Sequence, residues 1–118
     1  MIEQNKALVE RFVSALNAHR LDLLDELLTP NFVRHCQATP GVEVRNLDEF
    51  KNFQRQDATA FPDSHQTLKY LIAEGNRVTA WATYEGTQAG PLGPFPASGK
   101  KMQVEFAAVF RVENGRLA

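Results

Sequence analysis

This sequence has little cysteine, little tryptophan and almost no net charge. It has one cysteine and one tryptophan among 118 residues, and its formal net charge is -1. The single cysteine, Cys36, cannot form an internal disulfide. A chain so close to neutrality gives no sign of a nucleic-acid partner or of attraction to an anionic membrane.

Long apolar runs and common ligand-binding motifs are also absent. No apolar run approaches the roughly 18 residues of a membrane span, and the opening residues, Met-Ile-Glu-Gln-Asn-Lys, are too polar for a signal peptide. His19, His35 and His65 show no paired metal-ligand spacing. The glycines between 86 and 99 precede a strand pattern, not the helix of a phosphate loop. We therefore expect a cytoplasmic protein with no metal, no cofactor, and neither a membrane nor a nucleic-acid partner.

Helical periodicity dominates the first half of the chain. Apolar residues recur at intervals of three and four, which predicts helices over 2–18, 21–28 and 47–60. Pro30 ends the second helix, because the residue before a proline avoids the α region. Asn46 is a suitable N-cap for the third helix. Residues 31–36 alternate weakly and predict a short strand, with Phe32 and His35 on opposite faces.

Strand periodicity dominates the second half. Alternating runs predict strands over 66–73, 77–88 and 101–112. Asn114 and Gly115 follow the third run, and Asn-Gly favours a type I′ hairpin because both central residues need a positive φ. Few residues follow this turn, so we expect the last strand to be missing or cut short.

Helices followed by antiparallel strands predict an α+β fold, in a single domain over 1–118. One face of the expected sheet is almost uniformly apolar and should face the helices. Its members are Val78, Ala80, Ala82, Tyr84, Met102, Val104, Phe106, Ala108, Phe110 and Val112. The other face is mixed and carries Trp81, which is typical of a subunit contact. We therefore expect a homodimer through the outer sheet face.

Several short segments, taken in order, match one family. They are residues 6–12, 24–33 with His35 after them, the Phe-Pro-Asp of 61–63, 72–78, 86–87 and 110–117. Together they make the sequence resemble the SnoaL-like polyketide cyclases (ester cyclases) of the nuclear transport factor 2-like superfamily. The resemblance covers essentially the whole chain. It implies a cone-shaped α+β barrel, in which three N-terminal helices pack on a strongly curved antiparallel sheet and an apolar pocket opens between them.

The resemblance also implies a chemistry. The characterised cyclases are cofactor-free and close a ring by an intramolecular aldol step. In them an acid/base aspartate, just after a tryptophan on the last strand, works with nearby histidines. This sequence ends at Ala118, before such a segment, and a strand position that can hold a family histidine reads Ala108. We expect a longer natural chain, a disordered tail or a second subunit to cover the edge of the third strand.

Four residues are candidates for catalysis. An aldol step needs a base to remove a proton next to a carbonyl and a group that stabilises the enolate. His35 matches a family pocket position, Asp57 lies on the buried arc of the third helix, and Tyr84 faces the helices. Asp63 belongs to the Phe-Pro-Asp motif. We predict His35 and Asp57 as base and partner, with Tyr84 as the carbonyl donor.

Each candidate has a structural alternative. His35 could be a rim residue bonded to backbone, and Asp57 a boundary residue that reaches water or an arginine. Asp63 could form a turn by bonding its own backbone. Tyr84 could be buried with its hydroxyl on a backbone partner.

Five further residues are expected to contact a substrate: Phe12, Phe50, Phe53, Phe106 and Gln54. The four rings would belong to the core and line the pocket at once, and Gln54 lies on the same helical arc as Asp57. The leading hypothesis is a small cofactor-independent enzyme for aldol-type cyclisation, isomerisation or a lyase reaction on an apolar, oxygenated carbonyl ligand. The second hypothesis is a non-catalytic domain that binds a small apolar ligand or a protein.

Overall fold

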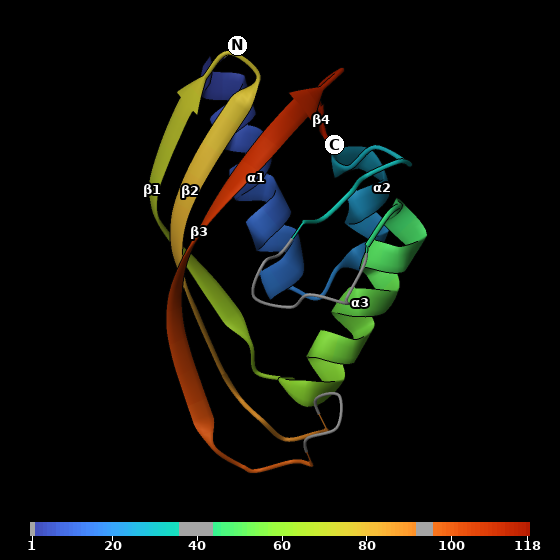
Figure 1. Cartoon of the computed structure of the whole chain (residues 1–118), viewed down its shortest axis with the longest axis vertical. Helices are drawn as coiled ribbons and strands as arrows, with labels where there is room; N and C mark the ends of the chain where they lie inside the picture. The colour runs from blue at the N-terminus through green and yellow to red at the C-terminus, as the bar shows by residue number, and fades with distance from the viewer. Residues whose placement is uncertain (1, 36–43, 92–95) are drawn as a thin grey trace.

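The computed structural model describes residues 2–35, 44–91 and 96–118. Cys36 and the centre of the Gly/Pro-rich loop after β2 lie outside these ranges. The elements are α1 (Ile2–Asn17), the 3-10 helix η1 (Leu21–Leu23), α2 (Leu24–Leu27), α3 (Leu47–Ala60), β1 (His65–Glu74), β2 (Arg77–Thr87), β3 (Lys101–Glu113) and β4 (Arg116–Leu117) (Figure 1). Within the described ranges, no helix is long and apolar enough to cross a bilayer.

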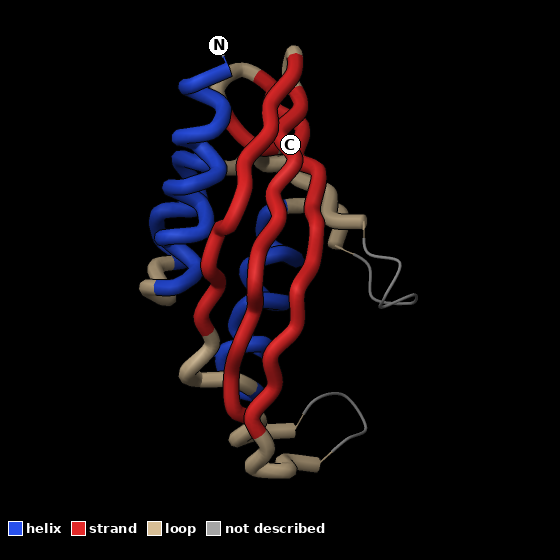
Figure 2. Tube along the Cα trace, turned by 90° about the vertical axis from the view of Figure 1, so that its left-hand side faces the viewer, coloured by secondary structure: helices blue, strands red, loops and turns tan. Residues whose placement is uncertain are grey.

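The helices lie on one side of a curved sheet. The strand order is β1-β2-β3-β4, and every neighbouring pair is antiparallel. Figures 1 and 2 show α1 and α3 on the concave side, while no described helix covers the convex side. The α+β fold with three N-terminal helical segments on a curved antiparallel sheet is therefore confirmed.

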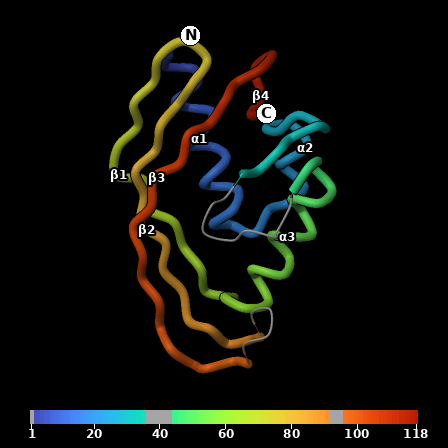
Figure 3. Tube along the Cα trace, viewed as in Figure 1, coloured from blue at the N-terminus to red at the C-terminus, as the bar shows by residue number. Residues whose placement is uncertain are grey.

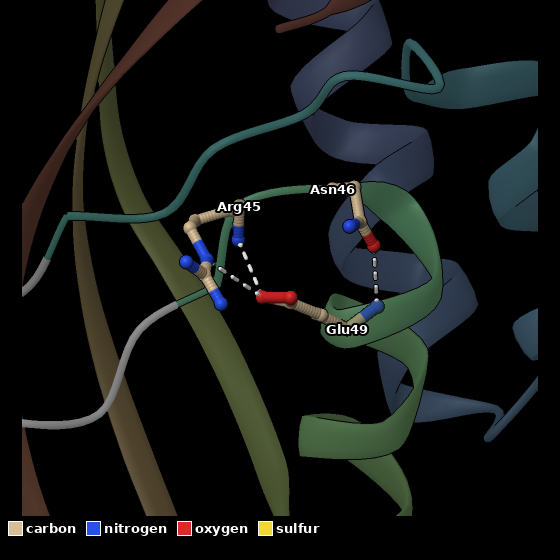
Figure 4. A network of polar contacts seen from close by, with 3 residues as sticks. All are labelled: Arg45, Asn46 and Glu49. Atoms are coloured by element: carbon tan, nitrogen blue, oxygen red, sulfur yellow. Dashed lines mark hydrogen bonds and ion pairs between the residues drawn. The ribbon is translucent and has the colours of Figure 1, made fainter.

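Hydrogen bonds fix the start of α3. The Oδ1 atom of Asn46 accepts the backbone N–H of Glu49 at 2.9 Å, which confirms the predicted N-cap. The Glu49 side chain accepts the backbone N–H of Arg45 at 3.1 Å (Figure 4). Such reciprocal bonds satisfy amides that a helix N-terminus leaves without partners. They fix the residue at which α3 begins.

A bulge in β1 changes which side chains face the helices. The pairing register shifts between Leu68, which is opposite Ala82, and Tyr70, which is opposite Trp81. An extra residue in one strand reverses the alternation beyond it. The partly buried positions are therefore Gln66, Leu68, Leu71 and Ala73. Tyr70 and Ile72 are exposed on the convex side instead.

A tight turn returns the chain from β3 to β4. Asn114 and Gly115 have φ values of 53° and 77°, so the predicted positive-φ pair is confirmed. β4 pairs with β3 only at Val112 and Glu113, and its Leu117 is fully buried. The carbonyl of Leu117 accepts the N–H of Thr29, which places β4 beside the end of α2 (Figure 3).

Phenylalanine rings fill much of the space between α1, α3 and the sheet. Phe12 and Phe50 are 5% and 3% exposed. The ring of Phe12 lies 5.7 Å from that of Phe110, centroid to centroid, and Phe32 lies 5.0 Å from Phe50. Edge-to-face packing at these distances is favourable and fills this part of the interior with side chains.

Two predicted elements differ from the structure. The strand expected over 31–36 is wrong: in the described residues Arg34 forms only an isolated bridge with Val44. The N–H of Phe32 bonds the carbonyl of Thr29 at 3.1 Å, so the chain turns where the strand was expected to begin. The helix expected over 21–28 is divided into η1 and α2, because the N–H of Leu24 bonds a carbonyl only three residues back.

Candidate functional site

A hydrogen-bonded pair joins α3 to β2 on the concave side of the sheet. The Tyr84 hydroxyl donates to Oδ2 of Asp57 at 3.0 Å, and both side chains are partly buried. Asp57 lies on the face of α3 that meets the sheet, and the alternation of β2 directs Tyr84 toward the helices. The ring of Phe61 lies edge-on to that of Tyr84, with centroids 6.0 Å apart, and holds it in place.

The surroundings of the pair shift the ionisation of both groups. Burial raises the pKa of the Asp57 carboxyl above its usual value. The Tyr84 hydrogen bond and the charges of Arg34 and His19 oppose that rise but do not cancel it. Burial and the neighbouring Asp57 carboxylate raise the pKa of Tyr84. Asp57 can therefore exchange a proton closer to neutral pH than an exposed aspartate, while Tyr84 stays protonated and can donate.

A small cavity adjoins the pair. Its volume is about 10 Å³, which is room for about one water molecule. Most of its lining residues are polar: Leu16, Asn17, His19, Gln54, Asp57, Ala58, Ser64, Gln66 and Tyr84. The resemblance implied an apolar pocket, whereas the cavity found among the described residues is narrow and polar. Side chains such as Phe12 and Phe50 occupy the core instead.

Asn17 fixes one wall of this cavity. Its Oδ1 atom accepts the backbone N–H of Gln66 at 2.8 Å, and its Nδ2 donates to the carbonyl of Gln66 at 2.9 Å. This pair of bonds ties the end of α1 to the start of β1. Next to it, His19 has a positive φ of 55° and an exposed side chain, so it lies where the cavity meets solvent.

Comparison with known proteins decides the family. The family model for SnoaL-like polyketide cyclases matches residues 6–118. The chain belongs to the SnoaL-like polyketide cyclase family. A comparison with curated proteins found no match.

Solved structures agree with this assignment. TsrD from Streptomyces laurentii is 32% identical, with a TM-score of 0.84 over 98% of this chain and 84% of TsrD. A SnoaL-like protein from Jannaschia sp. CCS1 is 24% identical, with a TM-score of 0.87 over 98% of this chain and 81% of that one. An LEH-like epoxide hydrolase of M. tuberculosis, 18% identical, matches with a TM-score of 0.78 over 98% of this chain and 78% of its own. The last two likenesses concern the fold alone.

Two of the four predicted catalytic residues of this SnoaL-like protein come together, and two lie elsewhere. Asp57 and Tyr84 form the pair. His35 is exposed and is not among the described residues that line the cavity. Asp63 is exposed and its Oδ1 accepts the backbone N–H of Thr87 at 2.7 Å. This bond lowers the pKa of Asp63, which suits a carboxylate that fastens the end of β2.

The residues predicted to bind substrate are also divided. Gln54 lines the cavity, whereas Phe12 and Phe50 are buried in the core. Phe53 is partly buried and packs against the core, and Phe106 is partly buried on the concave face of β3. No group of three or more described His, Cys, Asp or Glu side chains is arranged to hold a metal ion.

Sequence reasoning did not identify Asn17, Gln66, His19 or Ser64 as site residues. Asn17 and Gln66 are 49 positions apart, and only the packing of α1 on β1 brings them together. His19 follows a helix end in a left-handed conformation that its sequence does not reveal. The one available signal was a polar residue, Asn17, close to the apolar stripe of α1.

Proposed function

We propose that this SnoaL-like protein is an acid/base enzyme that removes a proton from the carbon next to a carbonyl in a small oxygenated substrate. The observation that carries the proposal is the 3.0 Å hydrogen bond from Tyr84 to a partly buried Asp57. Membership of a family of polyketide cyclases supports it. A carboxyl with a raised pKa next to a neutral hydroxyl is a suitable base and donor for such a step.

Substrate binding would change the partner of Tyr84. A tyrosine hydroxyl has one proton to donate. When it donates to the substrate carbonyl oxygen, Asp57 loses a hydrogen bond that lowers its pKa and becomes a stronger base. Asp57 then takes the proton from the carbon, and the electron pair moves onto the carbonyl oxygen, where Tyr84 stabilises the enolate.

The enolate has several outcomes. Attack of its carbon on a second carbonyl of the same molecule closes a ring, and Asp57 returns its proton to the new alkoxide. Return of the proton to a different carbon gives an isomer, and loss of a leaving group gives a lyase reaction. The cavity holds about one water molecule, so substrate must displace side chains at its mouth, beginning with His19.

Deuterium exchange tests the proposal without the natural substrate. Cyclohexanone in D₂O would be incubated with the protein, and loss of the protons next to its carbonyl would be followed by NMR. We expect acceleration by the wild type and a loss of about 100-fold or more in Asp57→Asn. Asp48→Asn is the matched control, because Asp48 is exposed in the first turn of the same helix. Equal exchange rates for Asp57→Asn and the wild type would exclude Asp57 as the base.

A second candidate function is a non-catalytic binding domain, which the convex face of the sheet favours. Four large apolar side chains are exposed there: Tyr70, Ile72, Trp81 and Val109. They are contiguous, since Tyr70 is opposite Trp81 and Thr79 connects Ile72 with Val109 across three strands. A homodimer through this face would bury them.

Light scattering tests the homodimer, and the exchange assay tests whether the domain is non-catalytic. We expect wild-type protein to be dimeric, and Val109→Glu to be monomeric with an unchanged circular dichroism spectrum. A wild type that neither exchanges cyclohexanone protons nor dimerises would contradict both the enzyme and the dimer.

A further inference from the structure

Arg34 is held in place beside α3 by its backbone and by an aromatic ring. Its backbone N–H donates to the carbonyl of Val44 at 2.9 Å, which ties Arg34 to a residue just before α3. The central carbon of its guanidinium lies 4.5 Å from the ring centroid of Phe53. A guanidinium over an aromatic face is stabilised there and loses little further freedom when it binds a ligand.

One end of this guanidinium has no protein partner. The Nη1 atom of Arg34 is buried and makes no hydrogen bond with any described residue. Buried nitrogen donors in folded proteins are nearly always paired, and a charged donor has the greatest need of an acceptor. The N–H groups of a guanidinium form a planar fork that matches a flat, anionic acceptor.

Arg34 lies within electrostatic reach of the proposed base. Its positive charge is one of the causes that lower the pKa of Asp57. Phe53, which carries the guanidinium, is four positions before Asp57 and thus on the same face of α3. Residues so spaced are about 6 Å apart along the helix surface. A molecule that spans about one helical turn can therefore reach both Arg34 and Asp57.

We propose that Arg34 binds a carboxylate of the substrate, so that the substrate class is an oxo acid whose carbonyl lies at Tyr84 and whose carboxylate lies about one helical turn away. A carboxylate matches the guanidinium in shape and in charge, one negative group against one positive group. The proposal rests on the proposed function for the reaction at the carbonyl. The recognition of a carboxylate is argued from the contacts of Arg34 and Phe53, and a separate binding experiment measures it.

Binding of benzoate against benzamide tests the charge recognition. The two probes have the same shape, but only benzoate carries a negative charge. In ¹H–¹⁵N NMR titrations we expect benzoate to shift the amide signals of Phe53 and Asp57 at lower concentrations than benzamide. Arg34→Gln should weaken benzoate binding at least tenfold and leave benzamide binding unchanged. Arg55→Gln is the matched control, because Arg55 is exposed on α3, the helix of Phe53 and Asp57, and its side chain donates to Oδ1 of Asn52 at 2.7 Å.

A further variant separates this proposal from the proposed function. Asp57→Asn should keep or improve its affinity for benzoate, because a neighbouring negative charge is removed, while it loses cyclohexanone exchange. If Arg34→Gln fails to fold, Arg34→Lys takes its place, because it keeps the positive charge. Arg34→Lys should retain part of the preference for benzoate over benzamide. Equal affinities of the wild type for benzoate and benzamide, no binding of benzoate, or full benzoate binding by Arg34→Gln would overturn the proposal.

Discussion

Replacing Asn17 by alanine should destabilise the protein measurably, because it removes the link between α1 and β1. The change deletes a donor and an acceptor at once. The Oδ1 bond to the Gln66 N–H is 2.8 Å long and the Nδ2 bond to the Gln66 carbonyl is 2.9 Å long. β1 is an edge strand, so these two backbone groups have Asn17 where an inner strand would have a neighbouring strand.

The expected cost follows from these two bonds. Each net hydrogen bond contributes about 0.5–1.5 kcal/mol, so the pair contributes about 1–3 kcal/mol to the free energy of unfolding. Gln66 is only partly buried, and water would therefore satisfy part of what is lost. Alanine also favours helix over asparagine by up to roughly 0.7 kcal/mol. We expect a net loss of about 1–2.5 kcal/mol, or about 4–10 °C in Tm for a domain of this size.

Asn5→Ala is the matched control. Asn5 lies on the same helix and its Nδ2 also donates to a backbone carbonyl, that of Gly75, but the bond is exposed and 3.3 Å long. Both changes replace an asparagine of α1 by alanine, so the difference between the variants reports mainly on the two bonds between Asn17 and Gln66. Urea unfolding followed by far-UV circular dichroism gives both values. If Asn17→Ala is as stable as Asn5→Ala or more stable, the bonds between Asn17 and Gln66 do not stabilise the fold as we argue.

Three further predictions concern stability. Gly90→Ala should cost about 1–3 kcal/mol in urea unfolding, because a Cβ there would lie 2.4 Å from the Thr59 carbonyl oxygen; an unchanged midpoint would contradict this. Asn46→Ala should cost about 1 kcal/mol by removing the cap on the Glu49 N–H, whereas Asn46→Asp should restore most of the loss. The folded-state pKa of Asp57 is raised, so protonation of its carboxyl favours the folded state. This contribution to the free energy of unfolding is complete below the unfolded-state pKa and is lost as pH rises through the folded-state pKa. Relative to the wild type, Asp57→Asn should therefore gain stability as pH rises above about 4, and a stability difference that does not change with pH would be inconsistent with the shift.

Local patterns predicted most of the elements and directed two of the four candidate residues toward each other. The helical arc of α3 and the alternation of β2 directed Asp57 and Tyr84 toward each other, and the structure joins them at 3.0 Å. Asn46 and the pair Asn114-Gly115 specified a helix start and a turn through their own side-chain and backbone preferences. Such features depend on residues within one turn of each other, which a sequence displays directly.

The remaining features depend on distant contacts. The turn after Thr29 replaced a strand that weak alternation had suggested, and Arg34, which was not a candidate, lies over the ring of Phe53 on α3. The bulge at Leu68 reverses the faces of β1, and no glycine or proline marks it in the sequence. The pairing of Asn17 with Gln66 requires the whole packing of α1 on the sheet.

Trp81 has a practical consequence for measurements on this protein. It is the single tryptophan of the chain, and it lies 41% exposed on the convex side of the sheet, on the opposite side from Asp57 and Tyr84. Its fluorescence will be insensitive to molecules that enter between the helices and the sheet. The same emission will move to shorter wavelength with rising protein concentration if two copies associate through that side, so one spectroscopic signal distinguishes self-association from ligand uptake.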